Sequence, residues 1–171
     1  MCKLWTMVRV GPILFLLLLS ACSAGGPGPS AEGSSGTPKA RDVRVERVAA
    51  GAPGEGPASP RVVLAPTAEI LSEELGAEIR SSGEGTYVVV YRGERPTGGY
   101  SVSVSGARIE GDRVTVRLSL KDPPPGAMVT QSLTYPYEIS VLRGVGPEGK
   151  SFTFVDGSGE ELDWPVRRVE G

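Results

Sequence analysis

The side chains that most enzymes use for acid–base and nucleophilic chemistry are scarce in this sequence. There is no histidine among its 171 residues, which excludes Ser-His-Asp and Cys-His catalysis and imidazole metal sites. Beyond the first 21 residues the lysines are Lys39, Lys121 and Lys150, and none lies beside a serine in the sharp strand-to-helix turn that would expose a nucleophile. We therefore expect no catalytic residue, no metal site and no cofactor, and we predict that the protein is not an enzyme.

One glycine-rich stretch is suited to contact another molecule. Paired glycines permit positive φ or a close backbone approach, and a following tyrosine offers an aromatic ring with a polar tip. Loops held on a rigid sheet commonly form binding surfaces, although a tight connection that needs glycine only for its geometry is the alternative. The stretch is no phosphate loop, because it lacks the Gly-Lys-Ser/Thr ending. The residues of this candidate contact loop are Pro96, Thr97, Gly98, Gly99 and Tyr100.

The first 21 residues are typical of a removable signal peptide. Two basic residues precede the apolar run 13–19, which is too short to span a bilayer by itself. The run ends in Leu-Ser-Ala-Cys, which resembles the bacterial lipobox, where the chain is cut before the cysteine and the thiol is diacylated with chains such as palmitate. We therefore predict cleavage between Ala21 and Cys22, lipidation of Cys22 and a membrane-anchored lipoprotein of the bacterial cell envelope. An ordinary secretory signal with an incidental Cys22 is the alternative.

Composition divides the remaining chain into a tether and a domain. Residues 22–59 are rich in Gly, Pro, Ala and Ser and predict a flexible tether, although the alternating run 43–48 would suit a short edge strand. Residues 60–171 predict one β-rich domain. The net charge of −2 and the lack of a basic cluster argue against nucleic acid as a partner.

Four apolar runs predict the principal strands. Three alternate with polar residues, which is typical of strands with one buried and one wet face. The fourth, 87–91, is apolar throughout and suits a strand covered on both faces. We expect the four to form one sheet, and we expect the Tyr100 ring to share the buried face of Val102 and Val104. The runs are 87–91, 101–105, 113–121 and 137–141.

A short helix and two hairpins complete the predicted fold. The helical period over residues 67–79 predicts a helix with Thr67 as its N-cap, and Gly76 is suited to end it. Residues 109–113 predict a tight hairpin turn, and residues 151–166 predict a C-terminal hairpin around Asp-Gly-Ser-Gly. The predicted fold class is therefore mainly β: an antiparallel sheet, or a small sandwich or barrel, with one short helix.

The order of several short motifs points to a family. Gly93-x-x-Pro-Thr-Gly-Gly-Tyr-Ser-Val precedes a Val-x-Val-x-Leu strand, and Pro-Gly-Ala-Met-Val-Thr-Gln and Tyr-Pro-Tyr-Glu-Ile follow. Over residues 88–142 this series resembles the C-terminal domain of the protease complex subunit PrcB family. The family is secreted or lipid-anchored, and its name comes from a lipoprotein that is an accessory of a surface protease complex and not the protease. The resemblance implies a noncatalytic interaction domain.

Two functions follow from these features. The first is a lipid-anchored accessory module that binds an extracytoplasmic protein, such as a surface protease that it stabilises. The second is a protease inhibitor that presents residues 96–100, because Pro-Thr-Gly-Gly-Tyr is similar to the Thr-Thr-Gly-Tyr loop that chagasin-type inhibitors insert into a protease cleft. Recovery of a stoichiometric partner would favour the first function, and inhibition of cysteine or serine proteases would favour the second.

Overall fold

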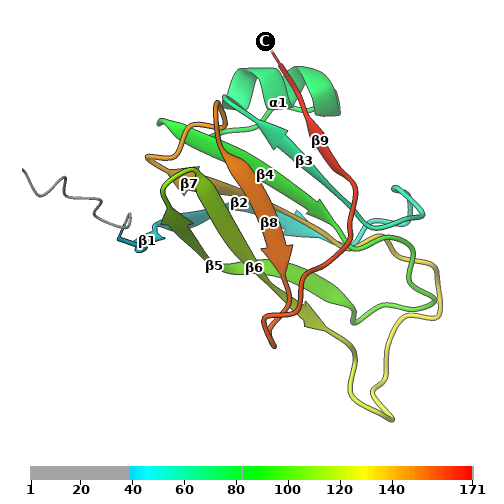
Figure 1. Ribbon diagram of the computed structural model, residues 1–171. Helices are drawn as coiled ribbons and strands as arrows, with labels where there is room; N and C mark the ends of the chain where they lie inside the picture. The colour runs from blue at the N-terminus through cyan, green and yellow to red at the C-terminus, as the bar shows by residue number, and fades with distance from the viewer. Residues whose placement is uncertain (1–38, 82, 171) are drawn as a thin grey trace, which may run out of the picture. The chain divides into compact units, whose positions relative to one another are not determined.

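The computed structural model describes residues 39–81 and 83–170, which form two packed β-sheets and a short helix (Figure 1). The first sheet has the strand order β1-β5-β6-β8 and the second has the order β2-β7-β4-β3-β9. The strands of the first sheet are β1 Arg41–Val43, β5 Ser101–Glu110, β6 Arg113–Lys121 and β8 Ser151–Val155. Those of the second are β2 Val45–Gly51, β7 Tyr137–Arg143, β4 Gly85–Tyr91, β3 Arg61–Ala65 and β9 Val166–Arg168.

The predicted mainly-β class with one short helix is confirmed, and the arrangement is an open sandwich without a closed barrel. Both sheets are antiparallel except at one edge each, where β8 runs parallel to β6 and β9 runs parallel to β3. The sheets are therefore mixed, whereas the alternating runs had suggested a purely antiparallel arrangement.

The expectation that the four apolar runs form one sheet is wrong. β4 and β7 are neighbours in the second sheet, while β5 and β6 are neighbours in the first. The connections that follow β4 and β6, residues 92–100 and 122–136, are long enough for the chain to cross between sheets. The tight turn at Gly111, which has φ 59°, instead keeps β5 beside β6 as predicted. Periodicity indicates which face of a strand is buried, but it does not identify the neighbouring strand.

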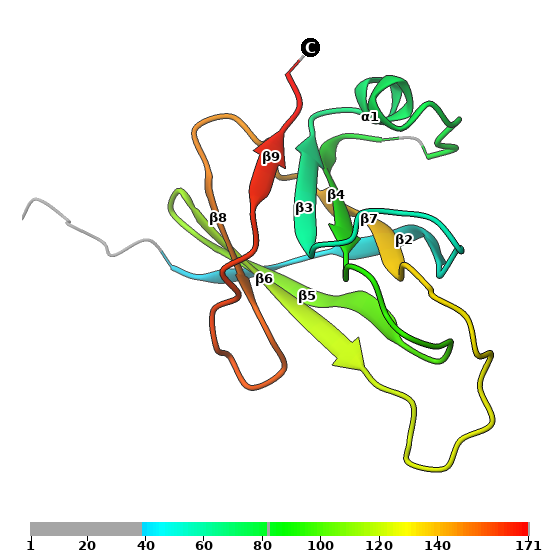
Figure 2. The same cartoon turned by 90° about the vertical axis from the view of Figure 1, so that its right-hand side faces the viewer.

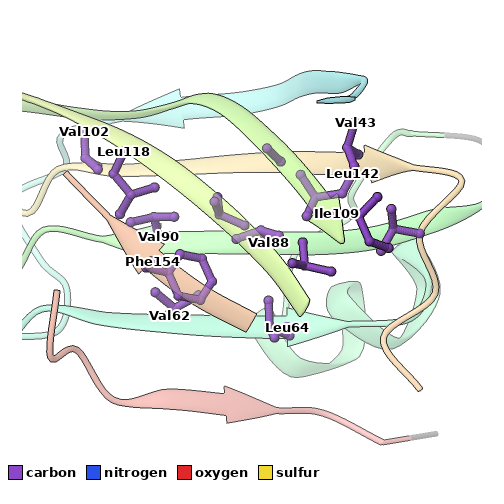
Figure 3. Close-up of a cluster of buried hydrophobic side chains, with 14 residues drawn as sticks. Val43, Val62, Leu64, Val88, Val90, Val102, Ile109, Leu118, Leu142 and Phe154 are labelled. Atoms are coloured by element: carbon purple, nitrogen blue, oxygen red, sulfur yellow. The ribbon is translucent and has the colours of Figure 1, made fainter. Parts of the chain in front are cut away.

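Two hydrophobic cores lie on opposite faces of the second sheet. Val90 of β4 belongs to the core between the sheets, together with Leu118 of β6 (Figure 3). The adjacent Val89 belongs to the core under the helix, together with Leu71. Neighbouring residues of a strand point to opposite faces, so a strand between two cores is apolar throughout. The prediction for residues 87–91 is confirmed.

The helix α1, Ala68–Leu75, covers part of the outer face of the second sheet. The Thr67 hydroxyl accepts a hydrogen bond from the amide of Ile70 (3.3 Å), as expected for an N-cap. Gly76 follows in the left-handed conformation with φ 62° and ends the helix. Both predicted end signals are confirmed, because the helix ends at Gly76 although the helical period continues to residue 79.

The predicted flexible tether of residues 22–59 is corrected in its second half, because residues 41–51 form β1 and β2. β1 pairs with β5 in the first sheet and β2 pairs with β7 in the second, so this stretch joins the two sheets. Val43 is 7% exposed and enters the core between them. The apolar members of the alternating run 43–48 pack on the two cores: Val43 and Val45 on the core between the sheets, and Val48 on the core under the helix. Residues 22–38 lie outside the described part of the chain.

The predicted C-terminal hairpin of residues 151–166 forms at its turn but does not continue as a pair of strands. After β8 the chain turns back, with a bridge between Val155 and Glu161 and backbone hydrogen bonds from Asp156 N to Glu160 O (2.9 Å) and from Leu162 N to Phe154 O (2.8 Å). It then crosses to the second sheet, where β9 pairs with β3. Pro165 has no amide hydrogen to continue a ladder, and its carbonyl accepts a hydrogen bond from the amide of Val62 in β3 (2.9 Å). The last strand therefore extends the second sheet.

A buried carboxylate links the sheets near a bulge in β5. Glu138 of β7 is 1% exposed and accepts hydrogen bonds from the amide of Val104 and the hydroxyl of Ser140, both at 2.8 Å. The register of β5 shifts between Val104 and Gly106, where the bulge lies. Arg47 Nε is 2.8 Å from the other carboxylate oxygen, close enough for an ion pair but without the angle of a hydrogen bond. These partners offset the cost of burying a charge.

Candidate functional site

Three loops meet at one end of the sandwich, on the right in Figures 1 and 2. They are residues 52–60 after β2, residues 92–100 after β4 and residues 122–136 after β6. Backbone hydrogen bonds join them: Glu94 N to Ala58 O (2.9 Å), Tyr135 N to Pro53 O (3.0 Å), and Arg95 and Thr134 in both directions (2.8 and 2.9 Å). Because each loop is bonded to another, they form one connected surface, which we call the loop end.

The candidate contact loop, residues 96–100, lies in the loop end and supports its neighbour. The amide of Gly98 donates to the carbonyl of Thr130 (2.9 Å). The hydroxyl of Thr134 donates to the carbonyl of Thr97 (2.7 Å). Thr97 and Gly98 are consequently half-buried, while Pro96 is exposed. The candidate contact loop is thus tied by its own backbone to residues 122–136.

The two glycines of this loop have different roles. Gly99 has φ 87°, and a Cβ added there would lie 2.9 Å from Cβ of Pro123 and 2.9 Å from Cγ1 of Val129. Both the backbone conformation and the close approach therefore require glycine. A Cβ at Gly98 would meet its nearest atoms, in Thr130, at 3.4 Å, an ordinary contact distance. Glycine is therefore required for its positive φ at position 99 and not at position 98.

Tyr100 does not share the valine core, contrary to expectation. Its half-buried ring belongs to neither of the two hydrophobic clusters of the described residues. Instead, the guanidinium carbons of Arg92 and Arg95 lie 5.2 and 5.9 Å from the ring centroid. Cation–π contacts of this kind are worth about 0.5–1 kcal/mol at exposed sites and about 2 when desolvated. Tyr100 thus packs the two arginines that hold the loop end together.

Arg92 is the central polar residue of the loop end, and it was not singled out from the sequence. It is 6% exposed, and its guanidinium donates to the carbonyls of Ser101 (3.1 Å) and Lys121 (2.5 Å). It also forms an ion pair with Asp122. Ser101 and Lys121 face each other at the end of the β5–β6 ladder, so Arg92 fixes the point from which residues 122–136 leave the sheet. In the sequence this residue belongs to an ordinary polar turn, Arg-Gly-Glu-Arg.

Residues 122–136, which we call the protruding loop, extend beyond the strands (Figures 1 and 2). Ala127 N donates to Pro124 O (3.0 Å) across a turn in which Gly126 has φ 79°. A proline followed by a glycine at positive φ matches a type II turn. The next residue, Met128, is fully exposed, and Leu133 is 49% exposed. The loop therefore presents apolar side chains to solvent on a defined backbone.

A polar contact joins the protruding loop to residues 92–100 near their bases. The Tyr135 hydroxyl donates to a carboxylate oxygen of Glu94 (2.7 Å). This hydrogen bond to a carboxylate raises the pKa of the Tyr135 hydroxyl. Since both groups are at the surface, the contact orients the loops and contributes little to stability.

The predicted cleavage and lipidation residues, Ala21 and Cys22, lie outside the described residues. Within the described part of the chain, no helix has the length and apolar character needed to cross a bilayer.

The fold and its loop end define a small β-sandwich that displays a connected set of loops. Residues 86–142 match the PrcB C-terminal family, which confirms the resemblance drawn from residues 88–142. The matched segment runs from β4 into β7 and contains both residues 92–100 and the protruding loop. This match suggests an accessory role associated with a protease complex. No curated protein and no solved structure matches the chain.

Proposed function

We propose that this protein is a noncatalytic accessory module that binds another extracytoplasmic protein and is held at a membrane of the bacterial cell envelope by lipid on Cys22. The observation that carries the proposal is the place of the family match. Residues 86–142 contain two of the three loops of the loop end, and hydrogen bonds fix those loops to each other. A rigid surface of this kind suits recognition of a partner, because little conformational entropy is lost on binding.

The location proposed for the protein rests on the N-terminal sequence. The Leu-Ser-Ala-Cys motif follows an apolar run as a lipobox does, and two acyl chains give stable anchoring. The lack of histidine in the whole sequence removes the Ser-His-Asp and Cys-His hydrolytic mechanisms. A partner associated with a protease complex agrees with the family match.

The experiment is affinity capture of the full-length protein from detergent-solubilised envelope membranes, with quantitative mass spectrometry of the eluate. We expect one extracytoplasmic protein, a protease or a protein bound to one, in near-stoichiometric amount. The Cys22→Ser protein, captured from the soluble fraction, serves as the control for enrichment by co-solubilised lipid. Repeated recovery of the protein alone would contradict the proposal.

The inhibitor alternative fits the loop geometry less well. An inhibitory loop uses its backbone amides and carbonyls to fill a protease cleft, but the Thr97 carbonyl and the Gly98 amide already bond within the protein. Assays against cysteine and serine proteases test this directly. Inhibition at micromolar concentration that is lost when Thr97 or Gly98 is replaced would favour the inhibitor over the accessory module.

A further inference from the structure

The protruding loop carries most of the exposed large apolar side chains. Among the described residues these are Met128, fully exposed, Leu133 at 49% and Val166 at 41%, and the first two lie in this loop. A fully exposed methionine contributes nothing to the core. Exposed apolar groups gathered at one place commonly mark an interaction site, and the flexible thioether of methionine adapts to varied apolar surfaces.

The loop is held ready for binding. Its turn is closed by the Ala127–Pro124 hydrogen bond, and its stem is fastened to the neighbouring loop through the Gly98–Thr130 hydrogen bond. Prolines at 123–125 restrict the backbone before the turn. Met128 is therefore presented from an ordered support, which lowers the entropic cost of immobilising it against a partner.

The charge of the loop indicates the chemistry of its partner. The sequence from Pro123 to Tyr137 contains no charged residue. Such a loop attracts neither an acidic nor a basic surface, and it lacks the lysines and arginines that draw proteins to anionic lipids. A convex, uncharged loop with an apolar tip fits a concave, apolar pocket.

The protruding loop leaves the first sheet at the end opposite to the one where the described chain enters. The described chain enters the first sheet at β1, where Arg41 pairs with Ile109 near the hairpin end of β5. The protruding loop leaves from Lys121, which pairs with Ser101 at the opposite end of the same strand. At about 3.4 Å per residue, the ten-residue β5 separates these ends by roughly 30 Å. The protruding loop and the entry of the described chain therefore lie at opposite ends of the first sheet.

We propose that the protruding loop is the partner-binding surface and that Met128 inserts into an apolar pocket of a partner protein. This inference rests on the proposed function and names the surface that performs it. Burial of an exposed methionine side chain corresponds to about a tenfold to a hundredfold gain in affinity. Because no charge is involved, binding should change little with salt concentration.

The test uses photo-methionine, a diazirine analogue of methionine, incorporated into the full-length protein in cells. The sequence has three methionines, and Met1 and Met7 lie in the predicted signal peptide, so the mature protein carries the probe at position 128. We expect irradiation of intact cells to yield one adduct with the same protein that affinity capture recovers. The control is the double variant Met128→Leu with Glu110→Met, which moves the probe to an exposed residue at the hairpin end, and it should give no such adduct.

Binding measured with matched variants completes the test. Met128→Asp should lower capture of the partner about tenfold to a hundredfold, and Met128→Leu should retain it. Both variants should unfold at the wild-type temperature, since residue 128 is fully exposed. An adduct with lipid in place of protein would overturn the inference. Undiminished capture by Met128→Asp would also overturn it while leaving the proposed function in place. Failure of the wild type to capture any partner would remove both.

Discussion

Replacing Arg92 with alanine should be the most damaging single substitution at the loop end. The side chain is buried and donates hydrogen bonds to the carbonyls of Ser101 (3.1 Å) and Lys121. It also stacks on Tyr100 and pairs with Asp122. Alanine would remove all four contacts and would leave an opening where the β5–β6 ladder ends.

The expected magnitude follows from these contacts. Each hydrogen bond to a charged group contributes about 1.5–3 kcal/mol, and the contact with Tyr100 adds about 0.5–1 kcal/mol. The pair with Asp122 adds little, because that side chain is 68% exposed and exposed pairs contribute about 0–1 kcal/mol. Water can reach the two carbonyls once the arginine is gone, so the lower parts of the ranges apply. We expect Arg92→Ala to lower the free energy of unfolding by about 3–4 kcal/mol, out of a total of about 5–15 kcal/mol.

The assay is equilibrium unfolding in urea of residues 22–171, which lack the predicted signal peptide. The fluorescence of Trp164 is the signal. Arg92→Lys keeps the charge but not the planar fork of donors, and it should recover only part of the loss. Arg95→Ala is the matched control, since Arg95 stacks on the same ring but donates one hydrogen bond, to the carbonyl of Arg92 (3.0 Å). That variant should lose about 2 kcal/mol. An Arg92→Ala protein no less stable than Arg95→Ala would refute this account of the loop end.

Three further predictions concern other parts of the chain. Gly99→Ala should lower the free energy of unfolding by about 1–3 kcal/mol because of its positive φ, whereas Gly98→Ala should unfold like the wild type; equal thermal unfolding of the two would contradict the distinction. Cys22→Ser should abolish labelling by radioactive palmitate and release the protein from membranes, and equal label in variant and wild type would disprove lipidation. Hydrogen bonds led by that from the Ser158 hydroxyl hold the pKa of the Asp156 carboxyl below its ordinary value of 3.8. The stabilisation by the ionised Asp156 carboxylate is therefore present above pH 3.8 and is lost as the pH falls through the lower folded pKa. The free energy of unfolding of Asp156→Asn, measured in urea at neutral pH and at successively lower pH, should therefore decline less on acidification than that of the wild type.

Local signals in the sequence predicted local structure well. Thr67 and Gly76 marked the ends of α1, because capping depends on the conformation and side chain of one or two residues. The apolar run 87–91 indicated a strand covered on both faces, because a strand has only two faces and alternation reports on each. The series of motifs over residues 88–142 identified the matching family for the same reason, since a motif is a local pattern.

The sequence by itself therefore determined α1, the strands β4 to β7 with most of their buried faces, and the likeness to the PrcB C-terminal family. The tertiary structure decided the pairing of the strands. It placed β9 beside β3, split the four apolar runs between two sheets and brought residues 41–51 into the fold. It also made Arg92 the centre of the loop end and left Met128 exposed. Each of these depends on contacts between segments far apart in the chain, and neither periodicity nor residue type specifies which distant backbone groups will meet.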